Sequence, residues 1–158
     1  MTVSSVRTPT ACLERAIAFQ QDAEQLSAIG NQWSAVAYFY AAFHAVRSAL
    51  MVDPIFNSPE RLALFDPNWR REDRQNDHHQ ARRGNGIVGA PGVSDLVKAL
   101  YPEIAIEYVQ LHSASVSVRY GLGLAGYDQA ALRRGYEKIA GAVKRNELVA
   151  TAPQADLG

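Results

Sequence analysis

Apolar residues are densest between Trp33 and Met51, in a run that contains neither glycine nor proline. When this run is wound as an α-helix, one of its stripes consists of Val36, Tyr40, Phe43, Arg47 and Leu50. A second, largely apolar stripe lies beside the first, so the apolar surface is wide. A helix of this kind must be covered by several neighbours. The pattern therefore predicts the central helix of a bundle over residues 33–51.

Helical periodicity continues on both sides of this run. Before it, apolar positions step by three and four from Cys12 to Ile29, with Thr10 as a candidate N-cap and Gly30 as the stop. After it, the same spacing predicts helices over residues 93–100 and 103–120, and a last helix capped by Asp128. A short helical turn is expected over residues 59–65.

The stretch after Met51 lacks a continuous helical pattern, because Pro54, Pro59 and Pro67 interrupt any long helix. It is also too long for an ordinary connection between two helices of a bundle. The predicted fold is therefore all-α: an up-and-down bundle of about four to five helices, with a long irregular insertion between the second and third main helices. One domain is expected over residues 10–150, with flexible termini at residues 1–9 and 151–158.

Composition limits the possible partners. The 158 residues carry 16 basic and 16 acidic side chains, so no net charge attracts the whole molecule to nucleic acid, and binding would need a local patch. The single cysteine, Cys12, has no internal partner for a disulfide. No uninterrupted apolar stretch reaches the roughly 18 residues typical of a membrane-spanning helix. We expect a cytoplasmic protein that does not bind a membrane.

Several of these features together resemble the HEPN superfamily. They are the alanine-rich first helix, the Gly30-Asn31 turn, the sequence Ala-Tyr-Phe-Tyr-Ala-Ala-Phe-His at residues 37–44, and Arg119-Tyr120 at the end of a later helix. The resemblance covers about residues 10–50 and 103–148. It implies a helical bundle that pairs into a homodimer. Active members are metal-independent ribonucleases, often toxins or defence proteins, whereas others bind RNA or a partner protein such as a nucleotidyltransferase.

The chain departs from the catalytic motif that the resemblance implies, which is an arginine followed after four to six residues by a histidine. Arg119 matches the arginine, but no histidine follows it. Metal-free RNA cleavage needs a proton acceptor and a cation, and arginine supplies only the cation. His112 lies seven residues before Arg119, about 10.5 Å away along one helix face. The candidate catalytic residues are therefore Arg119, His112 and Tyr120.

The charged part of the middle segment, next to Trp69, gives a second set of candidates. The residues predicted to bind RNA or another ligand are Arg70, Arg71, Arg74, His78, His79, Arg82 and Arg83. The alternative interpretation is an ordinary solvated face. His78 and His79 lack the spacing of a helical zinc site, so no metal is expected. Gly84, Gly86 and Gly89 match a dinucleotide fingerprint without the strand that should precede it, so they are read as a loop and no cofactor is expected.

Three functions remain open at this point. The first is a degenerate HEPN-like protein that binds RNA, a nucleotide or a partner protein in stress response or defence, for example within a toxin–antitoxin pair. The second is a metal-independent ribonuclease that completes its site with His112, His78 or His79. The third is a plain protein-interaction module. His44, on the central helix, is expected to pack in the core or in a dimer interface.

Overall fold

The computed structural model describes residues 7–79 and 91–151. In these residues it contains six α-helices and two 3₁₀ turns, and no strand: α1 (Pro9–Ala28), α2 (Ser34–Val52), η1 (Pro54–Asn57), α3 (Pro59–Ala63), η2 (Arg71–Gln75), α4 (Val93–Leu100), α5 (Pro102–Arg119) and α6 (Gln129–Lys144). The predicted all-α class is confirmed. Arg82, Arg83 and the glycines Gly84, Gly86 and Gly89 lie outside the described residues, as do residues 1–6 and 152–158.

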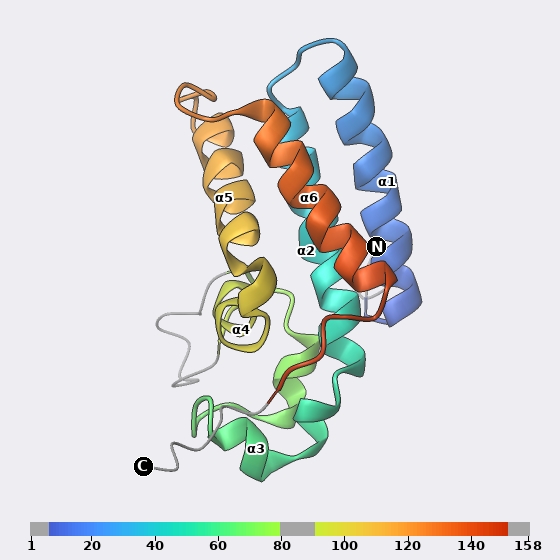
Figure 1. The fold of residues 1–158 in the computed structure, drawn as a ribbon, viewed down its shortest axis with the longest axis vertical. Coiled ribbons are helices and arrows are strands. Elements are labelled where there is room, and N and C mark those ends of the chain that lie inside the picture. Colours follow the sequence, from blue (N-terminus) through green and yellow to red (C-terminus); the bar gives the residue numbers. More distant parts are fainter. Residues whose placement is uncertain (1–6, 80–90, 152–158) are drawn as a thin grey trace, which may run out of the picture.

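The centre of the fold is α2 (Figure 1). Helices α1, α5 and α6 pack against it, and α4 packs mainly against α5. From Ser34 to Met51 every side chain of α2 is buried except Tyr40, which is half-buried. The prediction of a central helix over residues 33–51 is confirmed. The stretch Ser34–Asn57 is long and apolar enough to span a membrane, but 83% of its most apolar window is buried inside this fold, as in any core helix.

The helix ends follow from local sequence chemistry. Asp128 caps α6 as predicted, because its side chain accepts from the amides of Ala130 and Ala131. The prediction of Thr10 as the first cap is wrong, since Thr8 accepts from the amide of Ala11 and the helix begins at Pro9. Proline has no N–H to leave unpaired and suits the first helical position. Helix α1 therefore already begins within the stretch 1–9 that was expected to be flexible.

The segment after α2 is less irregular than predicted. Pro54 opens η1 and Pro59 opens α3, so these prolines begin helical turns instead of only ending them. Ser58 caps α3 by accepting from the amide of Arg61. Together with η2, these turns occupy much of the segment before residue 79. Their effect is to carry the chain back along α2 after it has left the end of that helix.

Asp53 joins distant parts of the chain at the end of α2. Its carboxylate accepts from the Tyr101 hydroxyl at 2.7 Å, from the Ala150 amide at 2.8 Å and from the Ile55 amide at 3.0 Å. Asp53 is 2% exposed, and burial of a polar group is tolerated when its hydrogen bonds are made. We call Asp53 and these three donors the Asp53 junction. It fixes the chain after α6 against the start of α5 and the end of α2.

Candidate functional site

Helix α5 brings two of the predicted catalytic residues to the side of α2. Arg119 donates from Nη1 to the Tyr40 hydroxyl at 3.5 Å, a long hydrogen bond. The His112 ring lies 4.9 Å from the ring of Phe39, centroid to centroid. Phe39 and Tyr40 are neighbours on α2, so the seven-residue spacing on α5 places His112 and Arg119 over adjacent parts of one aromatic surface.

A third polar side chain, His79, lies beside the same aromatic surface and comes from the segment after η2. Arg47 donates from Nε to the carbonyl oxygen of Asn76 at 3.2 Å, which fixes this segment to α2. The carbonyl oxygens of His78 and His79 accept from the amides of Val93 and Ser94, at 2.7 and 3.1 Å, where α4 begins. These first amides of a helix have no partner within it. The backbone on both sides of His79 is thus held between two helices.

The His79 ring completes a compact group. It lies 4.2 Å from the Phe43 ring and 6.0 Å from the His112 ring, with an angle of 30° between the two imidazole planes. We call this group the Arg119 cluster; it comprises His79, His112 and Arg119 on the rings of Phe39, Tyr40 and Phe43. The structure therefore brings together His79 and His112, two of the three histidines proposed as partners of Arg119.

Two nitrogen atoms of the Arg119 cluster are buried without a hydrogen-bond partner in the described part of the chain. They are Nδ1 of His79 and Nε of Arg119. The residues themselves are only half-buried, as is His112. Buried donors and acceptors without partners are costly and uncommon in folded proteins. An exposed edge together with unpaired polar atoms is typical of a surface that binds a polar ligand.

The charges around the cluster are uniform in sign. Burial lowers the pKa of His79 to about 4, and the neighbouring charges that lower it further are His112, Arg119, His78 and Arg47. Burial also lowers the pKa of His112, with Arg119 and Lys98 adding to the effect. No carboxylate of the described residues is among the groups that shift either pKa, or within 4.0 Å of Arg119. Among the described residues, the charged groups that act on these two histidines are therefore basic.

His44 extends the same surface toward α1. Its ring stacks on Phe19 at 5.7 Å, and the Arg15 guanidinium lies 5.9 Å from the centroid of that Phe19 ring. Burial lowers the pKa of His44 to about 4, assisted by Arg47, Arg15 and His79. His44 is 9% exposed, which agrees with the expected packing role, and its alternative place in a dimer interface stays a prediction.

The other predicted residues lie apart from the Arg119 cluster. Tyr120 follows Arg119 at the end of α5 but is 75% exposed. His78 is within 3.2 Å of Asp77, its neighbour in the chain. Arg70 caps η2 with its backbone amide bound to Asp73 at 2.7 Å. Arg71 and Arg74 face a separate pocket near the start of α1.

The described residues contain no group of three or more histidine, cysteine, aspartate or glutamate side chains that could hold a metal ion. The paired imidazoles of His79 and His112 are surrounded by cations and aromatic rings instead of carboxylates. A divalent cation would be repelled there, whereas an oxyanion would be attracted. The arrangement suits a phosphate.

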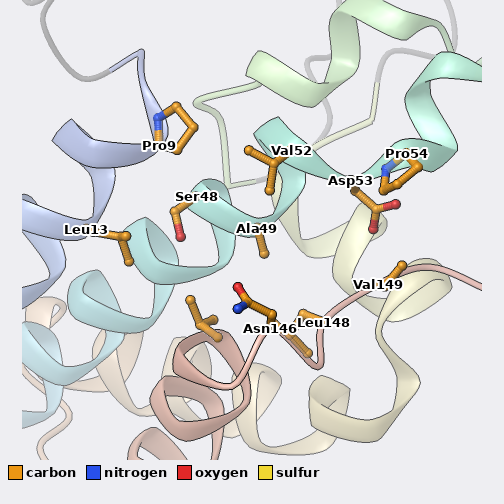
Figure 2. Close-up of a pocket in the computed structure, with 11 residues that line it drawn as sticks. Pro9, Leu13, Ser48, Ala49, Val52, Asp53, Pro54, Asn146, Leu148 and Val149 are labelled. Carbon is orange, nitrogen blue, oxygen red and sulfur yellow. The ribbon is translucent and has the colours of Figure 1, made fainter.

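A different cavity, of about 250 Å³, lies beside the Asp53 junction (Figure 2). Its walls come from the start of α1, the end of α2 and the chain after α6, including Leu13, Val52 and Leu148. Most of the lining is aliphatic, and the Asp53 carboxylate at its edge already accepts three hydrogen bonds. Its other polar side chains are Ser48, whose hydroxyl donates to the carbonyl oxygen of Ala45, and Asn146. It holds no cation to attract an oxyanion, so the Arg119 cluster is the stronger candidate site for a phosphate.

Comparison of the chain with protein-family models, with curated proteins and with solved structures found no match. The interpretation of the site therefore depends on its own geometry. Sequence reasoning missed the role of Phe39, Tyr40 and Phe43 as the platform of the site. Their signal was present, because residues three and four apart share a helix face, but the same spacing is typical of an ordinary core.

Proposed function

We propose that this protein is a HEPN-like RNA-binding protein of stress response or defence, and that the Arg119 cluster binds a phosphate of single-stranded RNA. The observation that carries the proposal is the convergence of Arg119, His79 and His112 on one aromatic surface, where the charged groups of the described residues that shift the histidine pKa values are all basic. A guanidinium forms strong charge-assisted hydrogen bonds to phosphate oxygens. The Nε of Arg119 has no partner among the described residues, so it is a further hydrogen-bond donor for a phosphate.

The exposed aromatic ring of Tyr120 supports a nucleic acid as the source of the phosphate. Tyr120 is 75% exposed and directly follows Arg119 in the chain. Proteins that bind single strands combine a positive surface with aromatic side chains on which bases stack. If Arg119 binds a phosphate, the base of the adjoining nucleotide would lie near the Tyr120 ring. The proposal assigns stacking to Tyr120 and gives it no part in proton transfer.

Fluorescence anisotropy with a labelled, unstructured RNA 8-mer tests the proposal. The variant is Arg119→Ala, and the matched control is Arg133→Ala, which removes the same charge from the exposed face of α6. Loss of one charge-assisted contact, worth roughly 1.5 to 3 kcal/mol, predicts at least a tenfold weaker complex for Arg119→Ala. The control should bind as the unaltered protein does. Absence of binding by the unaltered protein at low salt would refute the proposed function.

A second candidate function is metal-independent endoribonuclease activity, favoured by the lowered pKa of both imidazoles. At pH 7 these rings are neutral, and a neutral imidazole accepts a proton. His112 or His79 would take the proton of the ribose 2′-hydroxyl, the 2′-oxygen would attack phosphorus, and the 5′-oxygen would leave with a proton taken from the resulting imidazolium or from water. Arg119 would stabilise the charge that builds up on the phosphorane.

Incubation of mixed cellular RNA with the protein in excess chelator separates the two functions. Cleavage that requires Arg119 and is lost in His112→Ala or His79→Ala would establish the ribonuclease. Binding without cleavage would leave the binding function alone. A homodimer and a nucleotidyltransferase partner remain predictions that light scattering and co-purification would test.

A further inference from the structure

A second positive pocket lies at the other end of α2. Its volume is about 380 Å³, and its lining consists of Arg7, Pro9, Met51, Arg71, Glu72, Arg74 and Gln75. Three arginines from two distant parts of the sequence thus line one pocket, together with one glutamate. Two of them, Arg71 and Arg74, were predicted to bind a ligand, and the third, Arg7, lies just before α1.

The three arginines form no ion pair within the described part of the chain, although Glu72 lines the same pocket. None of them has a carboxylate within 4.0 Å among the described residues. Arg74 is held in place by a neutral partner, since its Nη2 donates to Oδ1 of Asn57 at 2.9 Å. This contact orients the guanidinium and leaves its charge available. Three like charges around one pocket repel one another, and a bound anion would relieve that repulsion.

The pocket and the Arg119 cluster lie along the same stripe of α2. Met51, Arg47, Phe43 and Tyr40 succeed each other at helical spacing, with Met51 in the pocket and Tyr40 under Arg119. The segment 71–79 runs beside this stripe, from Arg71 at the pocket, through Asn76 on Arg47, to His79 in the cluster. Eleven residues of helix separate Tyr40 from Met51, or about 16 Å.

The distance between the two sites favours a chain over two unrelated ions. The charges between them are mixed, since Arg15 stands over Phe19 on the α1 side and Arg47 is buried, while segment 71–79 also carries Glu72, Asp73 and Asp77. At about 3.4 Å per nucleotide of a stacked strand, 16 Å corresponds to about five nucleotides. A mononucleotide cannot reach both ends of such a strip, whereas a short single strand can.

We propose that Arg7, Arg71 and Arg74 form a second phosphate subsite, which binds the same RNA strand as the Arg119 cluster, so that the ligand is a single-stranded segment of at least about five nucleotides. This inference rests on the proposed function, because it assigns the anion to RNA. It adds the length of the ligand and the surface along which the strand lies.

The test compares an RNA dinucleotide with an unstructured 8-mer. The variant is Arg71→Ala/Arg74→Ala, and the matched control is Arg133→Ala/Arg134→Ala, which removes two exposed charges from α6. The subsite variant should bind the 8-mer about tenfold more weakly and the dinucleotide unchanged. The slope of log affinity against log salt for the 8-mer should fall by about 1.4. Arg119→Ala should weaken both ligands.

The outcomes distinguish this inference from the proposed function. If the unaltered protein binds neither RNA, the proposed function fails and the RNA subsite fails with it. If it binds the 8-mer through Arg119 but the subsite variant binds as tightly as the control, the second subsite is wrong and the proposed function stands. Thermal unfolding by circular dichroism should show the same midpoint for the subsite variant and the control, because both remove exposed or half-buried side chains.

Discussion

The Asp53 junction and the Arg119 cluster both use α2, yet their polar atoms differ in one respect. The Asp53 carboxylate accepts hydrogen bonds from Tyr101, Ala150 and Ile55. In the Arg119 cluster, His79 and Arg119 keep buried nitrogens without partners in the described part of the chain. A completed set of hydrogen bonds stabilises the fold, whereas an incomplete set costs stability and is available to a ligand. Among the described residues, unpaired buried polar atoms also occur in the core, at Tyr38, Tyr108 and Ser115, so the Arg119 cluster is distinguished by combining them with half-buried side chains and a positive charge.

The largest effect is expected from Asp53→Ala. This change leaves the Tyr101 hydroxyl and the amides of Ile55 and Ala150 without an acceptor, at a cost of roughly 1 to 3 kcal/mol for each buried group. The free energy of unfolding, measured by urea titration, should fall by about 3 kcal/mol or more. RNA affinity of the folded fraction should stay unchanged. A variant with unchanged stability would contradict a structural role for the junction.

Acid should destabilise the protein through the histidines. The folded-state pKa of both His44 and His79 is about 4, below the ordinary value of 6.5. Between these values the unfolded chain binds more protons than the folded chain, so stability is complete above pH 6.5 and is lost as the pH falls toward 4. Urea titrations at a series of pH values should show this loss. It should be smaller in His44→Gln/His79→Gln, and an equal loss in the variant would assign it to other groups.

Arg119→Ala should leave stability almost unchanged, in contrast to Asp53→Ala. Its one hydrogen bond, to Tyr40, is long, and its charge opposes protonation of His79 and His112. We expect a change of about 0.5 kcal/mol or less in the free energy of unfolding. The pKa of both histidines should rise, which NMR titration of the ring protons would show. A large loss of stability would place Arg119 with the structural residues.

The smallest effect is expected from Arg133→Ala. Arg133 pairs with Glu137 one turn along α6 at 3.1 Å, and both side chains are more than half exposed. Exposed pairs of this kind contribute roughly 0.3 to 0.5 kcal/mol. Neither stability nor RNA binding should change beyond this range. The variant therefore sets the baseline against which the other three are measured.

The core helices were predictable where apolar residues repeat at helical spacing or where a capping residue marks the start of a helix. The run from Trp33 to Met51 predicted the central helix, and Asp128 predicted the start of α6. The turns after α2 were harder to predict, because Pro54 and Pro59 are compatible both with an interruption and with the first position of a helical turn. Tertiary contacts decide between the two.

The site was predictable only along α5. The spacing of His112 and Arg119 follows from helix geometry, so their common face could be derived from the sequence. The position of His79 depends on the carbonyl oxygens of His78 and His79 meeting the first amides of α4, and on Arg47 holding Asn76. No local pattern encodes contacts between segments so far apart. For the same reason the meeting of Arg7 with Arg71 and Arg74 was not foreseen.

Hydrogen exchange of the Ala150 amide can report how the folded structure opens. Its only acceptor among the described residues is Asp53, 97 positions earlier in the sequence, and the amide lies outside every helix. This hydrogen bond is not stabilised by neighbouring bonds of a helix, so it depends on tertiary contacts alone. Hydrogen exchange at this single position would therefore report whether the chain after α6 detaches by itself or leaves only when the whole domain unfolds. In the first case, residues 145–151 form a small unit that opens independently of the helices.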